Sequence, residues 1–115
     1  MTKKFNFKKG RMGEDIALKY LVKKGYKLID KNARDRYGEL DLVMVIESRM
    51  IFVEVKARND ICNGLPEDSI NTNKLRRLRF AAQRYVYNQK FTGEYQIDTI
   101  CIIFSTGKIV HHQAI

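Results

Sequence analysis

The spacing of apolar side chains along the chain predicts two amphipathic helices. In the first, apolar residues recur at helical spacing from about Met12 to Lys24, and Gly25 supplies a stop signal. In the second, Asn71 or Thr72 can cap a helix that runs to about Asn88. One side of this second helix is apolar, and its other sides are basic. The basic residues are Lys74, Arg76, Arg77, Arg79 and Arg84.

Five strands are predicted beside these helices. Tyr26–Ile29 is a short strand, followed by a polar connection. Residues 39–46 and 50–57 are rich in Val, Ile, Leu and Met on both faces, as expected for strands covered by helices on each side. Tyr95–Phe104 and Lys108–Gln113 are the last two strands. The order is αβββαββ, and the helix between the third and fourth strands implies a right-handed crossover between parallel strands. The predicted fold class is therefore α/β, with a mixed central sheet flanked by helices.

Three charged residues interrupt the apolar run ELDLVMVIESRMIFVEVKAR, and strand geometry predicts that they share one face. A two-residue turn at residues 48–49 would place Asp41 opposite Lys56. Because strand side chains alternate with period two, Glu54 lies on the same face as Lys56. The three polar groups therefore converge on one side of the sheet. A three-residue loop would instead put Asp41 on the opposite face.

Two carboxylates and one lysine on one face fit either an ion-pair network or a cation site. Ion pairs are commoner than catalytic sites, which favours the network when charges alone are considered. However, Asp41 and Glu54 leave surplus negative charge beside Lys56 under apolar cover, which is costly without another cation. Mg²⁺ prefers oxygen ligands and is often held by one or two carboxylates. The cluster is therefore a candidate Mg²⁺ site.

Three further acids are each open to two interpretations. Glu14 lies on the apolar face of the first helix, where it either interacts with the first-turn amides or faces an active site. Glu39 is either a surface charge or an outer neighbour of Asp41. Asp98, at the start of the fourth strand, either caps backbone amides or joins the site.

Composition and charge narrow the location and the class of partner. The chain of 115 residues suits one domain, with residues 1–11 as a basic flexible arm and residues 12–115 as the domain. It has no 18-residue apolar run and no apolar secretory signal, so we expect a cytoplasmic protein with no membrane partner. Two cysteines without a CxxC pair argue against zinc. The formal net charge of +9 favours nucleic acid as partner, although charge alone also fits a merely soluble cation.

Four segments at these spacings resemble the YraN-like family of uncharacterised bacterial proteins. They are Gly13-Glu14, Gly38-Glu39-Leu40-Asp41, Phe52-Val53-Glu54-Val55-Lys56 and Tyr95-Gln96-Ile97-Asp98. The likeness extends from about Gly10 to the C-terminus. That family in turn resembles the restriction-endonuclease-like, or PD-(D/E)XK, fold, especially archaeal-type Holliday junction resolvases. Leu40 stands where many members of the wider fold carry a proline.

The resemblance implies a restriction-endonuclease-like domain with the catalytic residues Glu14, Asp41, Glu54 and Lys56. Mg²⁺ or Mn²⁺ would be held by Asp41, Glu54 and the carbonyl of Val55, with Glu14 binding directly or through water. The metal would polarise a phosphodiester oxygen and lower the pKa of a bound water. Lys56 would position that water or neutralise the developing charge. Basic residues would contact the nucleic-acid backbone without reading its sequence. These are Lys8, Lys9, Arg11, Lys74, Arg76, Arg77 and Arg79.

Three functions follow from these interpretations. The first is a metal-dependent endonuclease that hydrolyses phosphodiester bonds in DNA, with branched or single-stranded structures as candidate substrates. The second is a nucleic-acid-binding protein of nuclease-like fold without physiological cleavage. The third is an interaction protein whose acids serve only an ion-pair network. The set of Asp41, Glu54 and Lys56 favours the first over the third, and analogy with resolvases raises a homodimer as the oligomeric state.

Overall fold

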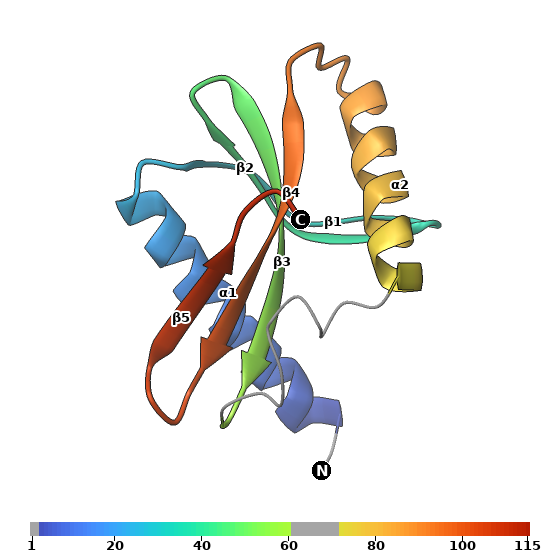
Figure 1. Ribbon diagram of the computed structural model, residues 1–115. Helices are drawn as coiled ribbons and strands as arrows, with labels where there is room; N and C mark the ends of the chain where they lie inside the picture. Colours follow the sequence, from blue (N-terminus) through green and yellow to red (C-terminus); the bar gives the residue numbers. More distant parts are fainter. Residues whose placement is uncertain (1–2, 61–71) are drawn as a thin grey trace.

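A mixed five-stranded sheet lies between two helices (Figure 1). The computed structural model describes residues 3–60 and 72–115. The elements follow the predicted order αβββαββ, and the strands lie in the sheet in their sequence order. They are α1 (Lys3–Lys23), β1 (Lys27–Asp35), β2 (Gly38–Ile46), β3 (Arg49–Arg58), α2 (Thr72–Asn88), β4 (Tyr95–Ile103) and β5 (Lys108–His112). This is the α/β architecture that the restriction-endonuclease-like resemblance implies.

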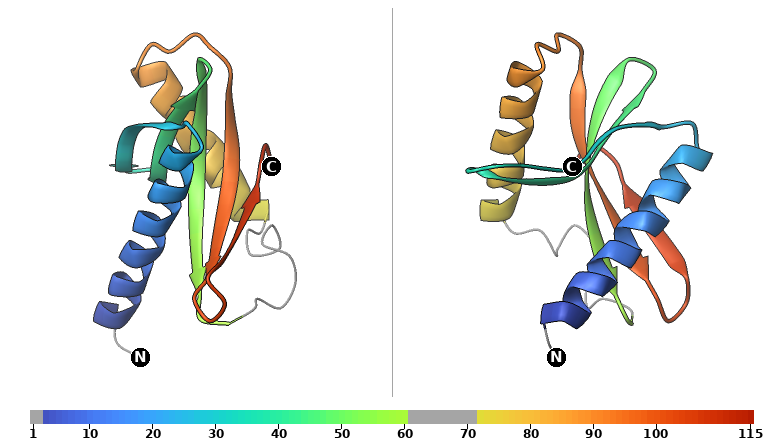
Figure 2. Two further views of the ribbon diagram at one scale, coloured as in Figure 1. Left: turned by 90° about the vertical axis from the view of Figure 1, so that its left-hand side faces the viewer. Right: turned by 180° about the vertical axis from the view of Figure 1, so that it is seen from behind.

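The pairing of the strands confirms the predicted crossover. β3 and β4 are parallel, and the other three neighbouring pairs are antiparallel. The two helices lie on opposite faces of the sheet, as the views in Figure 2 show. A parallel pair covered on both faces is buried, which explains the continuous apolar character of β3 and β4. Within the part of the chain described, no helix is long and apolar enough to cross a membrane.

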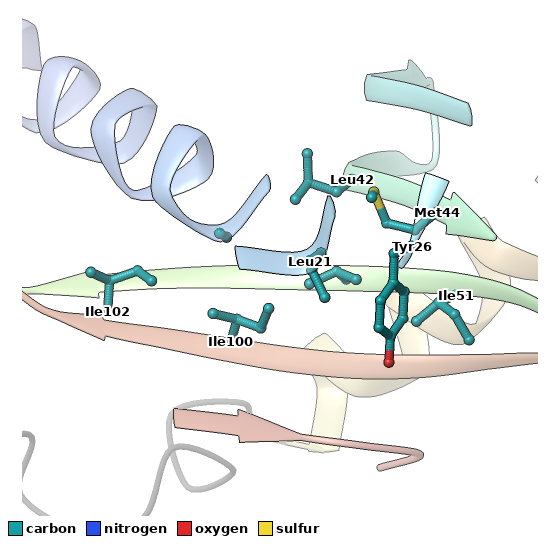
Figure 3. Close-up of a cluster of buried hydrophobic side chains, with 9 residues drawn as sticks. Leu21, Tyr26, Leu42, Met44, Ile51, Ile100 and Ile102 are labelled. Carbon is teal, nitrogen blue, oxygen red and sulfur yellow. The ribbon is translucent and has the colours of Figure 1, made fainter. Parts of the chain in front are cut away.

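Each helix packs against its own apolar cluster. On one face, α1 buries Ala17 and Leu21 against residues of β2, β3 and β4 (Figure 3). On the other face, α2 buries Leu78, Ala81 and Ala82. The strand residues of the first cluster are Leu42, Met44, Ile51, Val53, Ile100 and Ile102, and those of the second are Leu40, Val43, Met50, Phe52 and Ile97. Leu40, which period-two alternation assigns to the α1 face, therefore belongs to the α2 cluster instead.

Helix α1 begins at Lys3, well before the predicted start near Met12. Apolar residues do not continue at helical spacing through residues 3–11, so amphipathic periodicity alone gave a helix that was too short. Lysine and arginine have good helix propensity, and a helix rich in them can extend beyond the face that packs on the core. The backbone of residues 3–11 is thus helical, whereas residues 1–2 of the predicted arm lie outside the described residues.

Strand β1 is longer than predicted, because the polar connection after Ile29 is itself a strand. It pairs with β2 as far as Asp35 and Gly38. Pairing between β2 and β3, by contrast, reaches only Leu42 and Val53. Residues 31–40 therefore form a two-stranded extension of the sheet, which we call the hairpin arm. It crosses towards α2 (Figure 1), and its exposed position explains its polar composition.

Two side-chain contacts hold the hairpin arm against α2. At the tip of the arm, Arg84 Nε donates to Asp35 Oδ2 at 2.8 Å. Nearer the sheet, Tyr85 Oη donates to Asp30 Oδ2 at 3.2 Å. Burial and the neighbouring Asp30 carboxylate raise the pKa of Tyr85 to about 12, which keeps this hydroxyl a donor at neutral pH. The arm is therefore fixed to the helix that faces it.

The turn between β2 and β3 lies one residue earlier than predicted. Glu47 and Ser48 occupy its two central positions with φ of 48° and 66°, and Ile46 pairs with Arg49. Turns of this type favour Asn and Gly, so Glu-Ser gives a weak sequence signal. Shifting a two-residue turn by one position changes the register by two residues. Every side chain therefore stays on the predicted face of the sheet, although its cross-strand partner changes.

Gly13 allows α1 to approach β3 closely. A Cβ atom at this position would lie 2.9 Å from the Cβ of Ala57, which is closer than real side chains pack. A Cβ at Gly10, on the same helix, would meet nothing within 4 Å. The two glycines therefore differ in packing while sharing the low helix propensity of glycine.

We expect Gly13→Ala to lower the free energy of unfolding by about 1 kcal/mol, because overpacking outweighs the gain in helix propensity. Gly10→Ala should raise it by about 0.5–1 kcal/mol, because only the propensity changes. Urea unfolding of the two variants beside the parent protein measures both effects. Equal stabilisation by the two substitutions would contradict the close helix–sheet contact.

Candidate functional site

Asp41, Glu54 and Lys56 lie on the face of the sheet that α2 covers. Val43 and Phe52 are a cross-strand pair buried under α2, and alternation along β2 and β3 puts the three charged residues on that same face. The predicted turn at Ser48 and Arg49 would have placed Asp41 opposite Lys56, but the observed register does not. Since Leu42 pairs with Val53, the next positions along the two strands are those of Asp41 and Glu54.

Glu54 lies between two lysines. Its Oε1 atom is 3.5 Å from Lys56 Nζ and 2.9 Å from Lys74 Nζ, the latter on α2. The side chains of Glu54 and Lys56 are only 9% and 16% exposed, so these ion pairs are largely shielded from water. Sequence reasoning assigned Lys74 only to backbone contacts with nucleic acid. Its position as a partner of Glu54 depends on how α2 packs, which strand periodicity cannot indicate.

Asp41 carries a buried carboxylate that no ion pair neutralises among the described residues. Its Oδ2 atom accepts a hydrogen bond of 2.9 Å from the Val55 amide. Burial, and then the neighbouring charge of Glu54, raise the pKa of Asp41 to about 7. Burial also lowers the pKa of Lys56, and the nearby ammonium of Lys74 adds to this effect. The site thus concentrates negative charge at Asp41 within a basic protein.

The oxygen atoms of this site fit a small divalent cation. In the described part of the chain, Asp41 Oδ1 and Glu54 Oε2 have no hydrogen-bond partner, whereas Asp41 Oδ2 and Glu54 Oε1 are engaged. A strand residue directs its amide and carbonyl to the same side, so the Val55 carbonyl also faces β2. No group of three or more His, Cys, Asp or Glu side chains suited to a metal occurs among the described residues. A cation here would therefore use two carboxylates, a carbonyl and waters, a set that suits Mg²⁺.

Glu14 belongs to a neighbouring network rather than to the pair formed by Asp41 and Glu54. With its amide oriented to satisfy both acids, Asn32 Nδ2 donates to Glu14 Oε1 at 3.1 Å and to Glu39 Oε1 at 3.2 Å. Arg34 holds the other Glu39 oxygen at 3.1 Å. Burial raises the pKa of Glu14. Its charge contributes to the raised pKa of Asp41, so the two networks are electrostatically connected.

A cleft of about 530 Å³ opens over the acids, between the hairpin arm and α2. Asp41 and Glu54 both line it, and basic side chains line it from two directions. Arg34 and Arg36 come from the hairpin arm, and Lys74 and Arg77 come from α2. A polyanion in this cleft would meet cations on both walls, with the acids beneath them.

Only some of the basic residues predicted to contact nucleic acid lie in the cleft. Lys74 and Arg77 line the cleft. Lys8 and Lys9 lie on the backbone of α1, and their side chains are outside those described. The remaining three residues are exposed and do not line the cleft. They are Arg11 on α1, and Arg76 and Arg79 on α2.

Sequence reasoning missed the residues of the hairpin arm, because their segment was interpreted as a loop. Arg34, Arg36 and Tyr37 all line the cleft. A signal was present in Asp35-Arg36-Tyr37-Gly38, since Asp at the first position and Gly at the fourth are typical of a type I turn. In the structure Asp35 Oδ1 accepts a hydrogen bond of 2.8 Å from the Tyr37 amide, as expected for such a turn.

Asp98 lies away from the cleft and holds the C-terminal segment. It is fully buried on β4 and accepts hydrogen bonds from Gln96, His111 and the Ala114 amide at 2.8–2.9 Å. Ile97 faces α2, so Asp98 faces α1, where Tyr20 contacts the His111 ring. Asp98 was predicted either to cap backbone amides or to join the candidate site. The structure supports the first role, because Asp98 accepts from the Ala114 amide.

The fold and this site define a small α/β protein with a largely shielded acid–lysine cluster in a cleft that basic side chains line on two walls. The chain belongs to the uncharacterised protein family UPF0102, whose model matches residues 13–102, and the YraN-like resemblance is thereby confirmed. A UPF0102 protein from Syntrophomonas wolfei is 40% identical over 100 residues, covering 86% of this chain and 87% of the relative. One from Pelotomaculum thermopropionicum is 42% identical over 96 residues, covering 83% and 80% of the two chains. A third, from Rhodococcus opacus, is 34% identical over 103 residues, covering 89% and 87%.

We expect Asp41→Asn to stabilise the metal-free protein at high pH and not at low pH. The Asp41 pKa rises from an ordinary 3.8 to about 7 on folding, so the folded state binds more protons between these values. Raising the pH through this window therefore lowers the stability of the parent protein. The variant avoids this cost, which is on the order of a few kcal/mol above pH 7. Its advantage should vanish below about pH 4.

Thermal and urea unfolding from pH 4 to 8 in EDTA measure this difference. Asp15→Asn is the matched control, because it makes the same change at an exposed carboxylate on α1. That control should not show a growing advantage as the pH rises. An Asp41→Asn variant whose relative stability does not change with pH would contradict the buried, destabilised carboxylate.

Proposed function

We propose that this protein is a metal-dependent nuclease that hydrolyses phosphodiester bonds in DNA. The observation that carries the proposal is the placement of Asp41 and Glu54 in a cleft that basic side chains line from both walls. The two other acids of the lining, Asp35 and Glu39, are paired with Arg84 and Arg34. Cations on the walls attract the phosphate backbone, whereas buried acids repel it unless a divalent cation lies between them. Mg²⁺ or Mn²⁺ is therefore part of the proposal. A cytoplasmic location and a homodimer remain predictions.

Each residue of the cluster has a chemical role in this proposal. Bound Mg²⁺ would polarise a phosphodiester oxygen and lower the pKa of a water molecule. Asp41, Glu54 and the Val55 carbonyl would hold it. Lys56, beside Glu54 and largely shielded from water, would orient the attacking water or stabilise charge on the phosphate. Lys74 would fix the Glu54 carboxylate through its 2.9 Å contact.

Glu14 would act from outside the cation site. Its hydrogen bond from Asn32 supports a role through water or through charge, rather than direct ligation. So does the finding that Glu14 does not complete a three-residue metal group with Asp41 and Glu54 among the described residues. The negative charge of Glu14 favours a cation at Asp41, because it adds to the potential there.

A second candidate is a nucleic-acid-binding protein without cleavage activity. The observation that favours it is the pair of lysines on Glu54, because Lys56 and Lys74 already neutralise this carboxylate within the protein. In that case the acids and lysines would form a structural ion-pair network at the base of a phosphate-binding cleft.

The first test is cleavage of linear, flapped and four-way DNA and RNA substrates in Mg²⁺ or Mn²⁺. We expect the parent protein to cut at least one DNA substrate. The double variant Asp41→Ala, Glu54→Ala should lose at least 100-fold in rate, on the order of several kcal/mol of transition-state stabilisation from the metal. Denaturing gels with end-labelled strands measure both rates.

The matched control removes the same two charges elsewhere. Asp15→Ala, Glu94→Ala changes two exposed acids that do not line the cleft. It should cleave at the parental rate, which excludes a general effect of net charge. Cleavage by the cluster variant at the parental rate would refute the proposed site. Binding without cleavage across the panel would establish the second candidate instead.

The second test compares two arginines on one helix. Arg77 lines the cleft, whereas Arg79 is exposed outside it. We expect Arg77→Ala to weaken DNA binding by about 1 kcal/mol and to reduce the salt slope of log K by about one. Arg79→Ala should change neither by a comparable amount. Fluorescence anisotropy across a salt series measures both quantities, and equal effects of the two substitutions would place the DNA elsewhere.

A further inference from the structure

The tip of the hairpin arm carries two aromatic rings at the edge of the cleft. Tyr37 lines the cleft and is 39% exposed. Phe80, on the facing turn of α2, is 46% exposed. Their ring centroids are 5.2 Å apart and their planes are nearly perpendicular. Large apolar rings in a polar, basic surface are costly to expose, so a role in binding is worth considering.

Charged neighbours fix the Tyr37 ring in place. The Arg84 guanidinium lies 4.3 Å from the ring centroid and is itself held by the 2.8 Å bond to Asp35. The Tyr37 amide is bonded to the same aspartate. Arg36 lies farther from the ring, at 5.1 Å, and forms no ion pair within the described part of the chain. The Tyr37 ring is therefore held by Arg84 and by the hydrogen bond of its own amide, and Arg36 is a second cation next to it.

The rings lie within a few nucleotides of the acid pair. Tyr37 precedes Asp41 by four residues, and an extended chain of that length spans at most about 14 Å. Each strand of a duplex has a phosphate about every 3.4 Å along its axis, so this distance equals roughly four nucleotides. A strand with a phosphate over Asp41 and Glu54 would therefore reach Tyr37 within a few nucleotides.

We propose that Tyr37 and Phe80 form a stacking platform for an unpaired base, which directs the cleft to single-stranded segments. Stacking needs exposed aromatic surface next to cations, and Tyr37 and Phe80 are both partly exposed beside a cleft with basic walls. Bases in an intact duplex are already stacked and cannot reach the platform. The inference rests on the proposed function only in taking the cleft to bind nucleic acid, and it does not require cleavage.

The test compares binding of a 12-nucleotide thymidine strand with binding of an abasic strand of equal length and charge. Fluorescence anisotropy is measured in EDTA, and again with the Asp41→Ala, Glu54→Ala variant as the starting protein. Neither cleavage nor repulsion of the phosphates by the metal-free acids then affects the comparison. We expect the parent protein to bind the thymidine strand about five-fold tighter or more, because stacking on an aromatic ring contributes at least that factor per base. Tyr37→Ala should bind both strands equally, with its affinity for the abasic strand unchanged.

Three variants make the result specific. Tyr37→Phe keeps the ring and should keep the preference for bases. Tyr37→Leu retains an apolar side chain against Phe80 but has no aromatic face, so it should lose the preference even if Tyr37→Ala folds poorly. Tyr87→Ala removes an aromatic residue of α2 that is 83% exposed and does not line the cleft, and it should behave as the parent protein.

The outcomes separate this inference from the proposed nuclease. Equal binding of the two strands by the parent protein would overturn the platform, as would a Tyr37→Leu variant that loses affinity for both strands alike. Asp41→Asn, which should not cleave, is expected to retain the preference for bases. A preference for bases that depends on Tyr37 would support the platform even if no substrate were cleaved.

Discussion

The burial of Asp41 beside Glu54 is the interaction on which the rest of the site depends. Burial of the Asp41 carboxylate, and then repulsion by the neighbouring Glu54, raise the pKa of Asp41 to about 7, which expresses the cost of this arrangement. The protein offsets this cost at Glu54 through ion pairs with Lys56 and Lys74, and at Asp41 only in part, through the hydrogen bond from the Val55 amide. A structure built only for stability could place an apolar residue at Asp41, since buried ionic groups rarely add net stability. The Asp41 carboxylate is therefore the feature of this cluster that most favours the proposed cation site.

The sheet and both helices contribute to this burial. β3 carries Glu54 and Lys56 in the centre of the sheet, and its parallel pairing with β4 keeps these residues away from an edge. The close approach of α1 at Gly13 covers one face of β3, and α2 supplies Lys74 on the other. The hairpin arm closes the site from the side, because Asp35 and Asp30 bind it to α2. The same packing that stabilises the fold thus sets the electrostatics of the acids.

The sequence was sufficient to predict that the three charged residues of the cluster share one face of the sheet, but not which side chains they contact. The turn was placed one residue late, yet Asp41, Glu54 and Lys56 were assigned to a common face, because a two-residue turn preserves parity wherever it lies. Their partners depend on the exact register and on the position of α2, so neither the Lys74 contact nor the separation of Glu14 could be predicted. The hairpin arm was missed for a different reason. Its residues are polar on both faces, and period-two alternation detects a strand only when one face is buried.

The position of the hairpin arm also constrains what the cleft can accept. A wall made of a two-stranded extension and one helix is narrow and is lined by side chains from both directions. The arm is held at its tip by Arg84, which contacts both Asp35 and the Tyr37 ring. Movement of the arm would therefore break the bond to Asp35 and displace the ring together. Because Arg84 joins the tip of the arm to the aromatic ring, a displacement of the arm would weaken the proposed backbone attraction and the proposed base stacking together.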